Sequence, residues 1–315
     1  MPRPAPSDAV VICTRNRPGP LRRTLNSIAA HPPDIDLQLV VVDASDARQQ
    51  ARTRRLVESF ALRPSTYLPY TDAPSSARQR NAGLDLLSPS VEIVHFIDDD
   101  VTVHSGYFET LSETLRGRPN VGGVGGVVLE PSSTNSSARA AWLRYLFLLS
   151  HPEPGRVLPS GIATSAQHHI ADASSGLRTT AWLSGCASYR RPLLEQHRFD
   201  RALTGYSMLE DLDLSYRIHQ QTRLVVQPRA RLTHRRASRN RLDAERYSYA
   251  LTVHRRWFVE KHFAASSARL AYWWGLVGQL LAILTSSSPS RPAALRGLIR
   301  GVRTVLARDH PLLRS

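Results

Sequence analysis

The chain has little cysteine, almost no lysine and no apolar leader, and each shortage excludes a class of protein. Its 315 residues include only two cysteines, Cys13 and Cys186, both in apolar surroundings. We therefore expect neither a disulfide framework nor a zinc site, and the two thiols fit a reducing cytosol. Residues 1–7 lack the apolar core of a secretory signal. We expect the main domain to stay on the cytosolic side.

Acidic residues are scarce relative to basic ones. The formal net charge is +15, and almost all of the positive charge is arginine, with Lys261 as the single lysine. A GC-rich genome accounts for part of this bias, and the remainder fits phosphate ligands, an anionic membrane surface or nucleic acid. With 42% apolar and 21% charged residues, the composition is that of a globular protein with a sizeable core.

The first half of the chain alternates between strand and helix signals. Short apolar runs predict strands at 9–13, 37–42, 66–68 and 91–97, and helical periodicity predicts helices at 20–28, 48–60 and 75–87. This alternation indicates an α/β architecture with a mostly parallel sheet. The second half predicts a glycine-rich strand at 122–128, a polar insertion at 132–180, a strand at 224–226 and an amphipathic helix at 243–263.

Three consecutive carboxylates follow the apolar run at 91–97. Side chains alternate along a strand, so we expect Asp98 and Asp100 on one face and Asp99 on the other. Two carboxylates at the carboxyl edge of a sheet suit a hard divalent cation that carries a phosphate-bearing ligand. The alternative is a solvated acidic loop after a strand.

Two further features bear on chemistry. Glu210 and Asp211 open a helix, where carboxylates either cap the N-terminus or act on a substrate. His234 stands beside two arginines, and its local sequence is that of an exposed histidine. Asp213 and Arg217 stand four residues apart and predict a helix salt bridge.

The motifs, taken in order, resemble the family 2 glycosyltransferases over about residues 8–262. The resemblance rests on seven segments: residues 10–17, 40–43, 77–84, 96–100, 183–191, 210–217 and His234. It implies the GT-A fold, a Rossmann-like mixed sheet flanked by helices. It also implies an inverting enzyme of the EC 2.4 class that transfers a sugar from a nucleoside diphosphate.

The resemblance also implies roles for particular residues. Asp98 would contact the ribose, while Asp100 and His234 would hold Mn²⁺ or Mg²⁺. Asp211 would be the general base, and Glu210 would orient the acceptor or the loop. Donor contacts would come from Thr14, Arg15, Arg17, Asp43, Arg78, Arg80, Asp98 and Asp99. The acceptor side would be formed by Trp182 and Gly185.

Several of these roles have structural alternatives. Each arginine alone fits a solvated surface, and Trp182 fits a buried core as well as a stacking wall. The family usually has a second acidic residue directly after Asp43, but here Ala44 follows. This difference leaves open which nucleobase the donor carries.

The predicted organisation is a catalytic domain at 1–262, with 132–180 as a variable insertion, and a helical segment at 263–315. Residues 270–285 are apolar but too short to span a bilayer comfortably. Residues 291–308 are basic and amphipathic, with Leu295, Leu298, Ile299, Val302 and Leu306 on one face. Such segments lie at membrane interfaces or pack as ordinary helices.

We therefore expect a nucleotide-sugar donor, a glycan or lipid-linked acceptor, peripheral membrane contact at the inner face of the cell membrane, and a role in envelope polysaccharide synthesis. The oligomeric state stays open. A nucleotidyltransferase is the rival enzyme, but the glycine-rich, lysine-containing loop typical of it is missing after the first strand. The other rival is a basic nucleic-acid-binding protein. Its arginines would be clustered, whereas here they are dispersed, so no nucleic-acid partner is expected.

Overall fold

The computed structural model describes residues 7–60, 64–130, 138–170, 173–235 and 242–314. The chain divides into two compact units. The first, which we call the sheet unit, comprises Met1–Ser133 and Ser165–Asn240. The second, the helical unit, comprises Thr134–Thr164 and Arg241–Ser315. The predicted domain limits at 262 and 263 stay a prediction.

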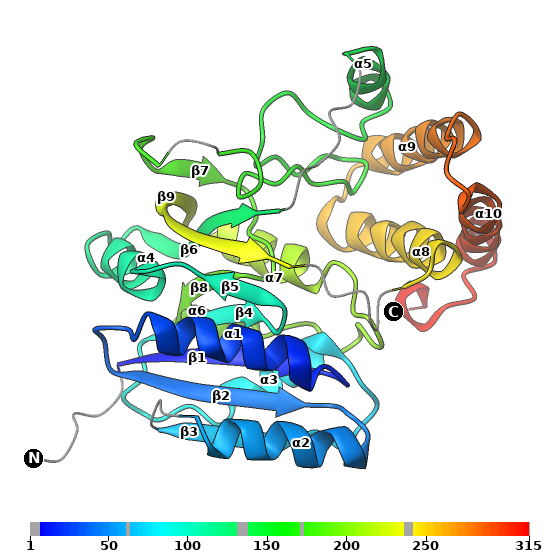
Figure 1. The fold of residues 1–315 in the computed structure, drawn as a ribbon. Coiled ribbons are helices and arrows are strands. Elements are labelled where there is room, and N and C mark those ends of the chain that lie inside the picture. Colours follow the sequence, from blue (N-terminus) through cyan, green and yellow to red (C-terminus); the bar gives the residue numbers. More distant parts are fainter. Residues whose placement is uncertain (1–6, 61–63, 131–137, 171–172, 236–241, 315) are drawn as a thin grey trace, which may run out of the picture. The chain divides into compact units, whose positions relative to one another are not determined.

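Over the residues that the structure describes, the sheet unit is built on one mixed sheet of nine strands (Figure 1). Its main path runs β3-β2-β1-β4-β8-β6-β9-β5, and β7 pairs with β9. The strands are β1 (Asp8–Thr14), β2 (Leu37–Asp43), β3 (Ser65–Pro69), β4 (Ile93–Asp98), β5 (Val101–Val103), β6 (Val121–Leu129), β7 (Arg178–Thr180), β8 (Ala187–Arg190) and β9 (Arg223–His234). Strands β3, β2, β1 and β4 are parallel, whereas β8 pairs antiparallel with both β4 and β6.

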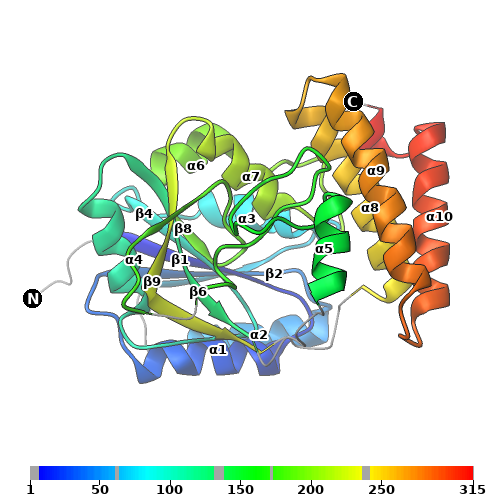
Figure 2. The ribbon, with the colours of Figure 1, turned by 90° about the horizontal axis from the view of Figure 1, so that it is seen from above.

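Helices cover both faces of this sheet (Figure 2). On one face, α1 (Pro18–Ala30), α2 (Ala47–Glu58) and α4 (Tyr107–Arg116) contribute to the buried cluster that contains Val10 and Ile12 of β1. The other face carries α3 (Ser76–Leu84), α6 (Arg191–His197) and α7 (Glu210–His219). Here Gly83 lets α3 approach Val11 closely, because a Cβ at Gly83 would lie 2.6 Å from Val11 Cγ1. Alternate side chains of β1 therefore pack against the helices on the two faces of the sheet.

Strand β9 is longer than the sequence suggested. The predicted strand at 224–226 and the segment that carries His234 form one strand of 12 residues. Its parallel pairing with β6 shifts between Gly126, opposite Gln227, and Val127, opposite Arg231, so that residues 228–230 form a bulge. Pro228 lies in this bulge, where a proline is tolerated because no ladder hydrogen bond needs its nitrogen.

The helical unit contains α5 (Ala138–Leu146), α8 (Ala244–His262), α9 (Ser266–Leu284), α10 (Arg291–Ala307) and the short η1 (Pro311–Leu313). Glycines allow α10 to lie directly on α8. A Cβ at Gly297 would lie 2.1 Å from the Glu245 carbonyl oxygen, and one at Gly301 would lie 2.8 Å from Thr252 Cβ. The buried guanidinium of Arg255 donates to the Ser160 carbonyl and to Gln279.

The mixed sheet with flanking helices confirms the predicted α/β fold class, and α8–α10 confirm the C-terminal helical extension. The predicted apolar face of α10 is buried in part. Leu298 is buried, whereas Ile299 and Leu306 are 44% and 68% exposed. The buried face of α10 is the one that carries Gly297 and Gly301 and packs on α8, and the pattern of apolar residues alone did not identify it. Among the residues that the structure describes, no helix has the length and apolar character of a membrane span.

Candidate active site

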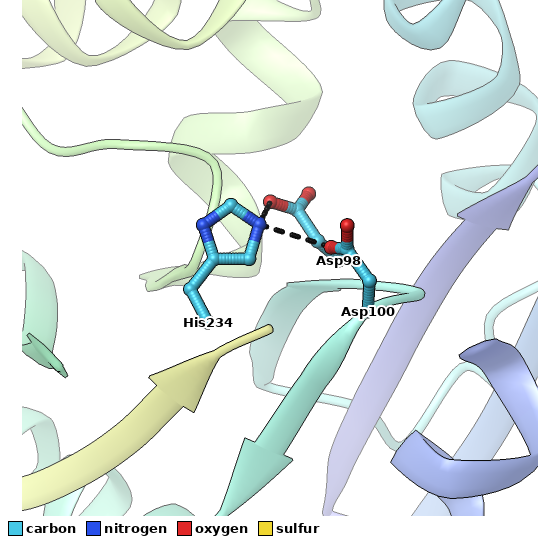
Figure 3. Close-up of side chains that lie close together, drawn as sticks. All are labelled: Asp98, Asp100 and His234. Carbon is cyan, nitrogen blue, oxygen red and sulfur yellow. Dashed lines mark hydrogen bonds and ion pairs between the residues drawn. The ribbon is translucent and has the colours of Figure 1, made fainter. Parts of the chain in front are cut away.

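The end of β4 with the turn that follows it, and the end of β9, bring the predicted ligands together at one edge of the sheet (Figure 3). Asp98 ends β4, and Asp100 lies in the turn that leads into β5. Because β5 and β9 are antiparallel with Val101 opposite His234, the neighbouring Asp100 lies beside the imidazole. The backbone amide of Arg235 donates to the Asp100 carbonyl over 2.9 Å and closes this pairing.

The three side chains have the spacing of ligands around one cation. His234 Nε2 lies 2.9 Å from Asp100 Oδ1 and 4.0 Å from Asp98 Oδ2. One ligand atom of each residue lies within 4.8 Å of the others. Octahedral Mg²⁺ binds oxygens at about 2.1 Å, which separates adjacent ligands by about 3.0 Å and opposite ligands by about 4.2 Å. Carboxylate and imidazole donors also suit Mn²⁺. The residues therefore fit a hard divalent cation.

The electrostatics of His234 reflect this acidic surrounding. Burial lowers the pKa of His234, but the hydrogen bond to Asp100 and the charges of Asp98, Asp100 and Glu130 outweigh burial and raise the pKa above its ordinary value. A protonated imidazole would pair with these carboxylates. A divalent cation bound to the neutral imidazole in place of that proton would meet the same negative charge.

Asp99 points to a different set of partners. Thr14 Oγ1 donates to Asp99 Oδ2 over 2.6 Å, and Arg17 Nη1 lies 3.1 Å from Asp99 Oδ1 and 3.6 Å from Asp100 Oδ2. Burial raises the pKa of Asp99 to about 7, against the opposing effects of Arg17 and Thr14. Asp99 thus contacts Thr14, but it shares Arg17 with Asp100. The strand alternation from which its direction was predicted does not apply here, because β4 ends at Asp98 and a turn directs the next two side chains.

Arg80 connects the acidic turn to the start of α7. Its Nη2 lies 3.4 Å from Asp98 Oδ1, and its Nη1 lies 3.4 Å from Glu210 Oε1. The guanidinium carbon lies 5.7 Å from the Phe96 ring and 5.3 Å from the Phe199 ring, so two aromatic faces hold it. The donor contact of Arg80 stays a prediction, and the structure places its guanidinium in a buried position between two carboxylates.

Gly185 makes room for this guanidinium. A Cβ at Gly185 would lie 2.8 Å from Arg80 Nη2 and 3.4 Å from Asp98 Oδ1. The residues just before it are joined to α7, since Ser215 Oγ accepts a hydrogen bond from the backbone amide of Leu183 over 3.1 Å. The segment predicted to meet the acceptor therefore lies beside both Arg80 and α7, with Trp182 half-buried on it.

Glu210 and Asp211 start α7 after an unusual loop. Gly205, Ser207 and Leu209 all have positive φ values, of 63°, 49° and 71°. Two of the three are not glycine, and such strained backbone often occurs at functional sites. Ser76 Oγ donates to Glu210 Oε1 over 3.1 Å. Burial raises the pKa of both Glu210 and Asp211, while the charge of Arg80 opposes this rise.

The remaining predicted residues lie around this centre in varied settings. Arg15 is exposed in the loop between β1 and α1. Asp43 is fully buried, and its carboxylate accepts hydrogen bonds from the Ser45 hydroxyl and amide and from Tyr67. Arg78 Nε donates to the Arg201 carbonyl over 3.0 Å. In this conformation Asp43 shapes the end of β2, and its predicted contact with the nucleotide stays a prediction.

Sequence reasoning missed Glu130 and His168. Glu130 Oε1 lies 3.5 Å from His234 Nδ1 and 3.6 Å from His168 Nε2. A carboxylate on the far nitrogen of a metal-binding histidine fixes the tautomer that leaves Nε2 free to coordinate. Glu130 directly follows β6, a strand adjacent to β9, so its place at a strand end was the available signal.

Comparison with known proteins now bears on the identity of this site. The family model described as glycosyltransferase-like family 2 matches residues 5–259. The chain belongs to this family. The resemblance to family 2 glycosyltransferases is thereby confirmed. The comparison with curated protein sequences found no match.

Two solved structures have the same fold. GalNAc-T7, solved with UDP, GalNAc and Mn²⁺, has a TM-score of 0.59 and 13% identity, over 90% of this chain and 58% of that chain. TarS 1–349 of S. aureus has a TM-score of 0.53 and 15% identity, over 94% of this chain and 81% of that one. The chain thus spans less than two thirds of GalNAc-T7. At these identities the likeness shows the fold, and it confirms the GT-A assignment.

Proposed function

We propose that the chain is an inverting, metal-dependent glycosyltransferase. It would transfer a sugar from a UDP- or dTDP-linked donor to a hydroxyl of a glycan or lipid-linked acceptor. The reaction would take place at the inner face of the cell membrane and would serve the synthesis of envelope polysaccharide. The observation that carries the proposal is the convergence of Asp98, Asp100 and His234 next to the Arg80–Glu210 pair in a family 2 member.

The donor end of the site would be the acidic turn. Asp100 and His234 would hold Mn²⁺ or Mg²⁺, and Asp98 would take the ribose or share the cation. When bound, such an ion supplies Lewis-acid stabilisation of the negative charge that grows on the departing diphosphate. The presence of UDP and Mn²⁺ in the GalNAc-T7 structure supports this kind of donor. Thr14 and Arg17 engage the Asp99 carboxylate, and Arg17, which also lies 3.6 Å from Asp100 Oδ2, offsets part of the negative charge of the acidic turn.

The acceptor end would be the start of α7. Asp211 would accept the proton of the acceptor hydroxyl as the oxygen attacks the anomeric carbon from the side opposite the diphosphate, which inverts the configuration. Burial raises the pKa of Asp211 and thus makes its carboxylate a stronger base than an exposed one. Glu210 is engaged by Arg80 and Ser76 and would orient the loop.

Two measurements test the proposal. UDP or dTDP with Mn²⁺ should raise the melting temperature, and a chelator should abolish the rise. Asp211→Asn should keep that shift but lose about 100-fold or more in turnover, the usual contribution of general-base catalysis. Asp85→Asn, which changes an exposed aspartate in the same unit, serves as the control. If no nucleotide shifts the melting temperature, the donor site is wrong, and an active Asp211→Asn variant would exclude Asp211 as the base.

A further inference from the structure

A stripe of exposed apolar side chains runs along α9 in the helical unit. Successive members are four, three, four and three residues apart, which places them on one side of the helix. They are Leu270, Trp274, Val277, Leu281 and Leu284, with exposures of 71%, 45%, 45%, 43% and 49%. The opposite side of α9 supplies Tyr272 and Leu276 to the core of the helical unit.

Helix α5 extends this stripe into a surface. Trp274 Nε1 donates to the Leu146 carbonyl over 2.8 Å, and the Trp274 and Phe147 rings lie 4.8 Å apart. Gly278 permits the contact, because a Cβ there would lie 2.2 Å from Phe147 Cβ. The exposed apolar residues of α5 are Trp142, Leu143, Tyr145 and Leu146, each at least 40% exposed. We call these four residues and the α9 stripe together the α5–α9 face.

The charge around this face is strongly positive. The helical unit contains 15 arginines and lysines against 5 aspartates and glutamates, so it carries +10 of the chain's net +15. Helices α5, α9 and α10 contain no acidic residue. Basic residues also border the stripe: Arg269 precedes Leu270, and Arg291 Nη1 lies 3.5 Å from the Leu284 carbonyl. Arg144 is exposed on α5 between the apolar residues.

We propose that the α5–α9 face docks on the surface of an anionic phospholipid bilayer. Its leucines, valine and tryptophans would enter the interfacial region, and Arg144, Arg269 and Arg291 would meet lipid phosphates. Tryptophan and tyrosine favour this depth because one end of each ring is apolar and the other is polar. With this face on the bilayer, α9 would lie along the interface.

The charge also decides against the other obvious occupant. A second copy of the chain would bring a second unit of the same +10 charge against the first, and α9 offers no acidic residue to pair with the partner's arginines. Anionic headgroups are complementary to the same surface. The sequence pointed to both 270–285 and 291–308 for membrane contact, and the proposed face uses the first of these, since the buried side of α10 packs on α8.

Two matched double variants test the proposal. Leu270→Glu with Leu281→Glu changes residues that are 71% and 43% exposed on the face, and Leu306→Glu with Ile299→Glu changes residues that are 68% and 44% exposed on α10. Both add two negative charges to the same unit. The full chain and both variants are sedimented with vesicles of phosphatidylcholine alone and of equal parts phosphatidylcholine and phosphatidylglycerol, at low and high salt.

We expect the wild type to bind the mixed vesicles, to bind phosphatidylcholine weakly, and to be released by salt. The α9 variant should lose about tenfold or more in partitioning, while the α10 variant should lose clearly less. Equal losses, or no wild-type binding, would overturn the proposal. A wild-type dimer that only the α9 variant dissociates would also overturn it and would assign the face to a second copy. The thermal shift with UDP and Mn²⁺ is measured on all three proteins, so failure of the donor site is seen separately.

Discussion

Replacing Arg80 offers the sharpest test of how the two ends of the candidate site are connected. Arg80 is buried between Asp98 and Glu210, and its charge opposes the burial that raises the pKa of Glu210 and Asp211. Arg80→Gln removes the charge but keeps a polar side chain. The pKa of both carboxyls should then rise further, so the general base would be protonated over more of the pH range.

The Arg80–Glu210 distance sets an upper limit on the effect at Glu210, and we expect a shift in the same direction and no larger at Asp211. At the 3.4 Å between Arg80 and Glu210, a unit charge pair attracts by about 5 kcal/mol at an effective dielectric constant near 20. One pKa unit corresponds to about 1.4 kcal/mol, which limits the shift to about 3.5 units. Carboxyls that gain or lose an adjacent arginine commonly shift by about 1–3 units. The two side chains are only 7% and 13% exposed, so water screens this pair little.

The assay is the pH dependence of kcat for sugar transfer or donor hydrolysis. A base that must be deprotonated loses activity as the pH falls through its pKa, so Arg80→Gln should move the acidic limb upward by about 1–3 units, with recovery at alkaline pH. Arg80→Lys, which keeps the positive charge, should move the limb clearly less than Arg80→Gln. Arg198→Gln, which breaks a more exposed pair with Asp85, should leave the limb in place. A loss in Arg80→Gln that is the same at every pH would refute the reasoning.

Two further predictions follow from contacts described above. Glu130→Gln should weaken Mn²⁺ binding by about 10–100-fold, measured by calorimetry in the presence of UDP, because the His234 imidazole loses its orienting carboxylate; unchanged affinity would remove Glu130 from the site. Gly297→Ala should lower the free energy of unfolding by about 1–3 kcal/mol in urea, since its Cβ would meet the Glu245 carbonyl. Gly19→Ala in α1, where a Cβ meets nothing within 4 Å, is the control, and equal effects of the two would contradict the packing argument.

The strands and helices of the sheet unit were largely predictable because their signals are local. The buried runs at β1, β2 and β4 and the apolar stripe of α1 each lie within a few consecutive residues. Apolar periodicity of this kind reflects the burial of one face or both faces of an element. The pattern therefore placed the acidic turn at the carboxyl end of β4.

Contacts between segments far apart in the sequence could not be predicted from these local patterns. The pairing of Asp100 with His234 joins residues 134 positions apart and depends on the register of β5 against β9. Arg80 reads as a surface residue of a polar helix, and only the rings of Phe96 and Phe199 and the carboxylates of Asp98 and Glu210 reveal why it is buried. Family resemblance supplied His234, because its local sequence, beside two arginines, favours an exposed side chain.

The bulge at residues 228–230 has a consequence for how the chain tolerates insertions and deletions. Successive side chains of a strand point to opposite faces, so a change of one residue in its length reverses every side chain beyond the change. His234 lies beyond the bulge, at the last position of β9. Inside the bulge this rule does not apply, because Gln227 and Arg231 stand four residues apart yet pair with the neighbours Gly126 and Val127. A one-residue deletion within 228–230 should therefore leave His234 opposite Val101, whereas the same deletion between Arg231 and His234 would turn the imidazole to the other face.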